Sequence, residues 1–120
     1  MKTHFISGHG DVSANEFWEH YVPDIDRAIK NGDSFVIGDF QGADLKAQVY
    51  LHFRGITNVT VYHMFVSPRY NAGGFPVVGG FTTDEERDAA MTNASDVDIA
   101  WIRKGKEKSG TQKNIDRRTK

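Results

Sequence analysis

A short apolar run that passes into a small-residue turn and then into a helical pattern constrains this fold most, and it occurs twice. In the first, residues 35–37 lead into Gly38-Asp-Phe-Gln-Gly-Ala-Asp44 and a helix. In the second, Ser109-Gly-Thr111 follows residues 101–106 and opens the last helix. Such turns aim backbone N–H groups and a helix N-terminus at one place, which attracts phosphate. Two of them in a small domain predict a nucleotide-type ligand.

The remaining segments predict a parallel sheet. Short apolar strands are expected at 3–6, 34–37, 59–62 and 97–102, with helical patterns between most of them. Short apolar strands separated by helices are typical of α/β folds, because each helical crossover returns the chain parallel to the previous strand. The 120 residues suffice for one core, so residues 1–120 are expected to form a single domain.

Local signals predict where the helices begin and which faces they bury. Ser13 with Glu16 matches a capping box. Pro23 predicts a kink or a break in the helix that begins after Ser13. In the helix expected over 42–54, apolar spacing assigns three side chains to the core: Leu45, Val49 and Phe53.

Two segments have open interpretations. Residues 63–82 are expected to form a long irregular loop, which in a compact domain is functional or disordered. Residues 103–120 hold eight Lys or Arg against two acidic residues. This basic end is either a solvated helix with a frayed terminus, or a basic wall beside the Ser109–Thr111 turn, or a weak nucleic-acid contact.

The composition excludes several classes of protein. The chain has no Cys, so disulfides and Cys-based zinc sites are excluded. The formal net charge of −1 argues against bulk attraction to nucleic acid or an anionic membrane. No run reaches the length of a membrane helix, no signal-peptide pattern is present, and the histidines show no metal-ligand spacing. We expect a cytoplasmic protein with no metal and no cofactor.

A larger set of residues, spread from Ile6 to Ile115, resembles the SLOG superfamily. This group includes the DNA-processing protein A domain and the lysine-decarboxylase-like phosphoribohydrolases, and it is similar in fold to the nucleoside 2-deoxyribosyltransferases. The residues that carry the resemblance are Gly-Asp-x-x-Gly-Ala-Asp at 38–44, Gln48, Asn-Val-Thr-Val-Tyr at 58–62, Pro68-Arg-Tyr-Asn71, Asp88, Met91, Ala94, Asp96, Trp101, Ser109-Gly-Thr111 and Asn114.

The resemblance implies a three-layer Rossmann-like sheet flanked by helices, with a nucleotide or nucleotide-derived ligand over the carboxyl ends of its strands. It also implies a homo-oligomer with its site near a subunit boundary. The ligand-binding residues expected on this basis are Ser7, Gly8, His9, Gly10, Gly38, Asp39, Gly42, Asp44, Ser109, Gly110 and Thr111.

The catalytic part of the resemblance is incomplete. The phosphoribohydrolases carry a Glu after their Gly-Thr turn, whereas Gln112, Lys113 and Asn114 follow Thr111 here. A nucleotide-binding module is therefore the first hypothesis, and an N-glycosidase or deoxyribosyl transfer enzyme is the alternative. The carboxylates that could serve such an enzyme are Asp39, Asp44, Glu85 and Glu86. A nucleic-acid accessory factor is the third and least favoured reading.

Individual candidates each have a structural alternative. Asp44 could contact ligand or cap its helix, and Asp39 could contact ligand or satisfy turn amides. Arg69 could pair with a phosphate or pin the long loop to a carboxylate. His9 could act as an acid or base, or could face solvent from its turn. Ser109–Thr111 could equally be an ordinary helix N-cap.

Overall fold

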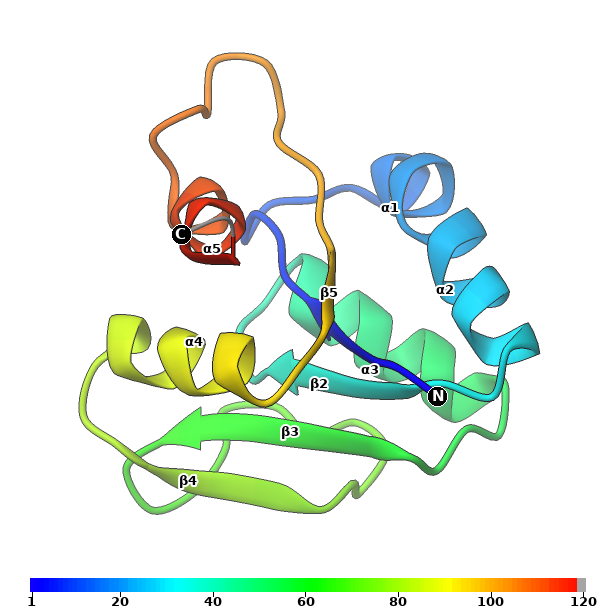
Figure 1. The fold of residues 1–120 in the computed structure, drawn as a ribbon, viewed down its shortest axis with the longest axis horizontal. Coiled ribbons are helices and arrows are strands. Elements are labelled where there is room, and N and C mark those ends of the chain that lie inside the picture. Colours follow the sequence, from blue (N-terminus) through cyan, green and yellow to red (C-terminus); the bar gives the residue numbers. More distant parts are fainter. Residues whose placement is uncertain (119–120) are drawn as a thin grey trace.

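The computed structural model describes residues 1–118 as a five-stranded, all-parallel sheet with helices on both faces (Figure 1). This is the predicted α/β, Rossmann-like class. The elements in chain order are β1 (Thr3–Ile6), α1 (Ala14–His20), α2 (Val22–Lys30), β2 (Ser34–Gly38), α3 (Ala43–Phe53), β3 (Val59–Met64), β4 (Val77–Phe81), α4 (Asp84–Asn93), β5 (Val97–Ile99) and α5 (Gly110–Arg118).

The strand order is β4-β3-β2-β1-β5. The chain therefore builds the sheet in one direction from β1 to β4, and then crosses to place β5 on the other side of β1. The strands that follow β1 lie on one side of it and β5 lies on the other side, so the direction of the strand order switches between β1 and β5. In open parallel sheets, ligands bind in the crevice at such a switch, beyond the carboxyl ends of the strands.

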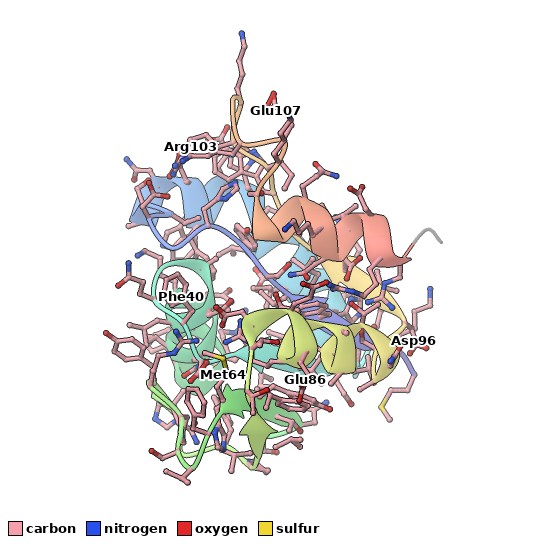
Figure 2. The ribbon with its side chains drawn as sticks, turned by 90° about the vertical axis from the view of Figure 1, so that its left-hand side faces the viewer. Phe40, Met64, Glu86, Asp96, Arg103 and Glu107 are labelled. Atoms are coloured by element: carbon pink, nitrogen blue, oxygen red, sulfur yellow. The ribbon has the colours of Figure 1, made fainter. Side chains whose placement is uncertain are left out.

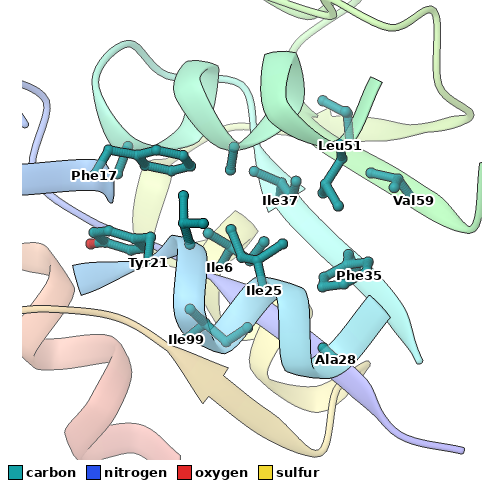
Figure 3. Close-up of a cluster of buried hydrophobic side chains, with 14 of the residues drawn as sticks. Ile6, Phe17, Tyr21, Ile25, Ala28, Phe35, Ile37, Leu51, Val59 and Ile99 are labelled. Atoms are coloured by element: carbon teal, nitrogen blue, oxygen red, sulfur yellow. The ribbon is translucent and has the colours of Figure 1, made fainter. Parts of the chain in front are cut away.

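Alternate residues of the strands supply two apolar layers. On one face, Ile6, Phe35 and Ile37 pack with α1, α2 and α3, as Figure 3 shows. On the other face, Phe5 and Val36 pack with Met91 of α4. Because both faces are covered, the central strands are apolar at nearly every position, which is why they could be recognised in the sequence.

The predicted boundaries of the first helices are confirmed. The Ser13 hydroxyl accepts from the Glu16 N–H and the Glu16 carboxylate accepts from the Ser13 N–H, so both halves of the capping box form. Pro23 lies in the first turn of α2, so the chain breaks between α1 and α2 at Tyr21. A proline lacks the N–H that a continuous helix would need there.

The prediction for α3 was right in its extent and wrong in its buried face. Val49 and Phe53 are exposed, at 51% and 83%, and Leu45 is only half-buried. The buried side chains of α3 are Ala43, Asp44, Ala47, Gln48 and Leu51. The small alanines let the helix approach the sheet closely, and Gln48 is satisfied by hydrogen bonds to Gly38 O, Tyr70 O and Ala72 N.

The segment 63–82 was predicted as one irregular loop, and this was wrong at both of its ends. β3 continues to Met64, and residues 77–81 form the edge strand β4. The sequence did not predict β4 because Pro76, Gly79 and Gly80 stand beside or within it, and proline and glycine are unfavourable in strand interiors. The prediction of a strand over 97–102 was too long, because β5 ends at Ile99.

Within the basic end, residues 110–118 form the helix α5, and residues 103–109 form the irregular segment that leads to it. The Arg118 guanidinium pairs with Asp98 at 2.8 Å and donates to the carbonyl oxygens of Thr92 and Ser95. Arg117 donates to Asn114 at 2.8 Å. Residues 110–118 thus form a helix with side-chain anchors, the predicted fraying of the basic end stays a prediction, and Lys120 lies outside the described residues.

Candidate functional site

An open cavity of about 480 Å³ lies at the carboxyl ends of the strands, at the switch between β1 and β5. Figure 2 looks toward this end of the sheet, with Phe40 before α3 and with Arg103 and Glu107 on the segment that leads to α5. The volume is within the usual range for small-molecule sites. Its lining residues come from four chain segments, which lie within residues 5–11, 40–44, 84–91 and 106–114.

The turn after β1 supplies a close-fitting wall. A Cβ on Gly8 would lie 2.1 Å from the Tyr21 hydroxyl and 2.4 Å from the Ala43 Cβ, so only glycine fits there. The Tyr21 hydroxyl donates to Ser7 O at 2.8 Å and accepts from the Trp101 N–H at 3.3 Å, which fixes the turn to the segment after β5. Ser7 lines the cavity and is only 6% exposed, yet its Oγ has no hydrogen-bond partner among residues 1–118.

The N-terminus of α5 forms a second wall. Ser109 Oγ accepts from the Gln112 N–H at 3.2 Å and so caps the helix. The first N–H groups of a helix have no intrahelical acceptor, and the helix dipole adds partial positive charge there. Ser109, Gly110 and Thr111 all line the cavity, and Lys106 adds a cation to the same wall.

The wall opposite is acidic and carries one buried arginine. Asp44, Asp84 and Asp88 line the cavity together with Arg87. Burial raises the pKa of Asp44 to about 7, although Arg87 and the Phe40 N–H oppose that rise. Burial also raises the pKa of Asp88, against its hydrogen bonds from Arg87 at 3.0 and 3.2 Å. This side of the cavity therefore holds carboxyl groups that keep a proton more readily than usual.

His9 joins the turn after β1 to the segment after β5. Its Nε2 accepts from the Arg103 N–H at 3.0 Å, and its ring meets Trp101 edge-on. Burial, followed by the charge of Arg103, lowers the pKa of His9. His9 is 7% exposed and lines the cavity, so it does not face bulk solvent from its turn.

Phe40 presents an aromatic ring to the cavity and is 39% exposed. The Arg69 guanidinium lies 5.0 Å from the ring centroid. Gly10 makes room for the ring, because a Cβ there would lie 2.5 Å from Phe40 Cε2. A partly exposed ring fixed in this way offers a flat apolar surface to a planar group.

Asp39 does not line the cavity. It is 1% exposed, and its carboxylate accepts from the Arg69 N–H at 2.8 Å, from Arg69 NH2 at 2.9 Å and from Arg87 NH1 at 2.8 Å. Burial alone would raise its pKa, but the hydrogen bonds from Arg69 outweigh burial and lower it. The structure thus places Asp39 and Arg69 together as the tie between β2 and the long loop, one of the two alternatives left open for Arg69.

Gly38, the last residue of β2, and Gly42, in the turn that follows, lie behind the cavity wall. Gly42 has φ +72°, and a Cβ on it would lie 2.4 Å from His9 O and 2.6 Å from Gly10 O. A Cβ on Gly38 would lie 2.5 Å from Asp44 Oδ2. Both glycines let neighbouring groups approach closely, and neither lines the cavity.

Glu85 and Glu86, predicted as candidate carboxylates, are exposed at the start of α4 and do not line the cavity. Thr83 caps this helix by accepting from the Glu86 N–H at 3.1 Å. The first residue of the same acidic run, Asp84, does line the cavity. Of the four candidate carboxylates, the structure brings Asp44 alone to the cavity.

Several lining residues were not proposed from the sequence as site residues. Arg87, Asp88 and Asn114 belong to helix faces that read as ordinary polar surface, and they lie inward only because α4 and α5 pack together. Asp88 and Asn114 carried part of the family resemblance, which was the one available signal. Phe40 stood within the first phosphate-type turn and gave no signal of its own. Lys106 belongs to the basic segment 103–120, for which a basic wall beside the Ser109–Thr111 turn was one of the predicted alternatives.

Within residues 1–118, no group of three or more His, Asp or Glu side chains is placed to hold a metal ion. No helix in the same range is long and apolar enough to cross a membrane. Comparison with known proteins gives no match: neither a family model, nor a curated protein, nor a solved structure matches this chain.

Proposed function

We propose that this protein binds a nucleotide or a nucleotide-derived small molecule in the cavity at the switch between β1 and β5. The observation that carries the proposal is the pairing of the α5 N-terminus with Ser7 across that cavity. Ser7 Oγ is a buried hydroxyl that forms no hydrogen bond with any described residue, and Gly110 and Thr111 bring N–H groups that have no intrahelical acceptor. A phosphate group satisfies both kinds of donor at once.

The distribution of charge around the cavity supports a ligand that has an anionic group at one end and hydrogen-bond donors at the other. The α5 N-terminus and Lys106 favour an anion. The carboxyl groups of Asp44 and Asp88, on α3 and α4, accept hydrogen bonds from hydroxyl or amine groups and disfavour a second anion. A phosphorylated sugar carries both kinds of group. The Phe40 ring provides a surface on which a nucleobase stacks.

Turnover of the nucleotide is the second candidate function, and Asp44 is the observation that favours it. Cleavage of an N-glycosidic bond needs a group that protonates the departing base, or a carboxylate beside the developing oxocarbenium ion. A cavity-lining carboxyl with a pKa of about 7 is able to hold or accept a proton near neutral pH. Asp44 is therefore the acid or base on which an N-glycosidase hypothesis rests.

Native mass spectrometry of the purified protein separates the two candidates. The protein is mixed with the 5′-ribo- and 5′-deoxyribonucleoside mono-, di- and triphosphates, and the small molecules are analysed in parallel. Retention of an intact nucleotide without release of free base supports a binding module. Release of free base together with sugar phosphate supports the enzyme. Retention of no nucleotide and release of no base would contradict both.

Ser7→Ala tests the carrying observation. Ser7 Oγ makes no hydrogen bond in the free protein, so the substitution leaves the free energy of unfolding nearly unchanged. It removes one hydrogen bond to the ligand, which is worth about 1 kcal/mol, or a five- to tenfold weaker Kd for the retained nucleotide by titration calorimetry.

The matched control for this prediction is Thr92→Ala. Thr92 Oγ1 is also buried and has no partner within the described part of the chain, but Thr92 does not line the cavity. Its loss leaves the Kd as in the wild type. Equal affinity in Ser7→Ala and the wild type would place the ligand away from Ser7.

A further inference from the structure

His9 connects three parts of the chain that meet at the cavity. Its carbonyl oxygen accepts from the Ala43 N–H at 3.2 Å, at the start of α3, and from the Val12 N–H at 3.4 Å. Its ring Nε2 accepts from the Arg103 N–H at 3.0 Å. No other predicted ligand-binding residue makes both a backbone bond to α3 and a side-chain bond to the segment after β5 within the described chain.

The Arg103 amide fixes the charge and tautomer of the ring. A backbone N–H always donates, so the Nε2 atom facing it must carry a lone pair and no proton. The neutral imidazole then holds its proton on Nδ1. Protonation of Nε2 would place two N–H groups against each other and break the contact with Arg103.

A chain of hydrogen bonds runs from this contact to the α5 N-terminus. Arg103 O accepts from the Lys106 N–H at 2.9 Å, and Lys106 O accepts from the Ser109 N–H at 3.1 Å. Ser109 in turn caps α5 through Gln112. The two ends of this chain, His9 and Ser109, both line the cavity. The Arg103 backbone is therefore linked by hydrogen bonds to Lys106 and, through Lys106, to Ser109.

We propose that His9 is a positioning residue of the cavity: its neutral imidazole, bonded to the Arg103 amide, helps to hold segment 103–109 in its ligand-binding arrangement. The inference rests on the proposed function in one respect: it makes this segment part of the nucleotide site. Acidification is then expected to release the segment and to weaken ligand binding.

The charged groups around the ring come from each packed segment. Asp11 and Glu16 favour the protonated ring, whereas Arg103 and Lys106 disfavour it. Asp11 and Glu16 are themselves paired with the Arg103 guanidinium at 2.9 and 2.8 Å, which reduces their pull on the ring. His20 stacks on the Trp101 ring that His9 meets edge-on. Burial and Arg103 prevail, so the pKa of His9 lies below the ordinary value of 6.5.

The test uses the ligand-free protein and three variants. His9→Gln keeps an oxygen acceptor for the Arg103 amide but does not titrate, and His9→Ala removes the acceptor. His20→Gln is the matched control, because it removes a histidine from the same Trp101 ring and leaves the Arg103 contact in place. Imidazole nitrogen NMR gives the tautomer and pKa of His9, and amide hydrogen exchange gives the protection of the Arg103 N–H.

At pH 7.5 we expect the Nδ1–H tautomer, and protection of the Arg103 amide at least tenfold lower in His9→Ala than in the wild type or His9→Gln. As the pH falls through the pKa of His9, protection falls about tenfold in the wild type and in His20→Gln but stays constant in His9→Gln. An Nε2–H tautomer, or equal Arg103 protection in all four proteins, would overturn the inference.

Binding is then measured at pH 7.5 and at pH 5 with inorganic phosphate as the probe. The wild type is expected to lose several-fold in affinity on acidification, beyond the loss due to protonation of phosphate itself, and His9→Gln to lose only the latter. If neither protein binds phosphate or any nucleotide, the proposed function fails while the ligand-free exchange results still decide the role of His9.

Discussion

At the scale of single residues, a glycine can be required by its backbone conformation or by the lack of space for a side chain. Comparing Gly42 with Gly55 distinguishes these two requirements. Gly42 and Gly55 have nearly the same φ, +72° and +73°, but only Gly42 has atoms close to its missing Cβ. Gly55→Ala is expected to lower the free energy of unfolding by about 1 kcal/mol, the usual penalty for a left-handed residue. Gly42→Ala adds the collision with His9 O and Gly10 O, so we expect a loss of about 3 kcal/mol or more.

Urea denaturation of both variants measures this difference. Equal losses in the two would mean that the turn before α3 relaxes to accept a side chain. The sequence suggested Gly42 as a ligand contact, and the structure instead places it as the point where two backbone turns meet. A larger side chain at Gly42 is consequently unsuited to a pure binding test, because it disturbs the fold as well.

Asp44 is expected to make stability depend on pH. Its pKa is raised from 3.8 to about 7 in the folded protein, so the folded chain binds this proton more tightly than the unfolded chain. Its contribution to stability is complete below about pH 4 and is lost as the pH rises toward 7. Asp44→Asn removes the titration. Relative to the wild type, this variant should gain roughly 1 to 3 kcal/mol in free energy of unfolding between pH 4 and pH 8.

Denaturant unfolding across that pH range checks the prediction. Asp24→Asn, an exposed carboxylate that pairs with Arg27 on the surface of α2, is the control and should follow the wild-type curve. If the difference in free energy of unfolding between Asp44→Asn and the wild type were the same at every pH, the pKa of Asp44 would not be raised in the folded state.

At the scale of elements, α3 shows what pattern alone misjudges. Leu51 is fully buried and Phe53 is 83% exposed. Leu51→Ala is expected to lower the free energy of unfolding by about 3 kcal/mol, through lost burial and a cavity. Phe53→Ala on the same helix should change it by less than about 0.5 kcal/mol. Thermal denaturation of the two variants distinguishes the two faces of α3. A larger loss of stability in Phe53→Ala than in Leu51→Ala would mean that the face expected from the sequence is the buried one.

The elements that the sequence predicts well are those whose signals are local. The capping box at Ser13, the break at Pro23 and the apolar run of β2 depend only on neighbouring residues, and all three are confirmed. The face of α3 and the strand β4 depend on distant partners. Gln48 is buried because the loop at 70–72 bonds to it, and Val77 pairs with Val61 despite the adjacent glycines. The spacing of apolar residues along the chain cannot predict contacts with such distant partners.

At the scale of the whole molecule, the sequence predicted a site at the carboxyl ends of the strands, where the cavity lies. It predicted only some of the residues that line this cavity. The rule for strand ends brought Ser7–Gly10, Asp44 and Ser109–Thr111 to one cavity. It could not separate Asp44 from Asp39, because both follow β2 and differ only in what their side chains meet. Asp39 meets two arginines, while Asp44 is left at the cavity with the Phe40 N–H. The homo-oligomer and the cytoplasmic location stay predictions.

The placement of β5 beside β1 has a consequence for the order in which the protein forms. Thr3 and Asp96, which join the two strands at one end, are 93 residues apart. Contacts between such distant residues form late, since the intervening chain must first be ordered. During synthesis, β1, β2 and β3 emerge early, but the α5 N-terminus emerges after every strand. The cavity is therefore completed only after all five strands have been synthesised, so a ligand bound there cannot guide the early folding of the sheet.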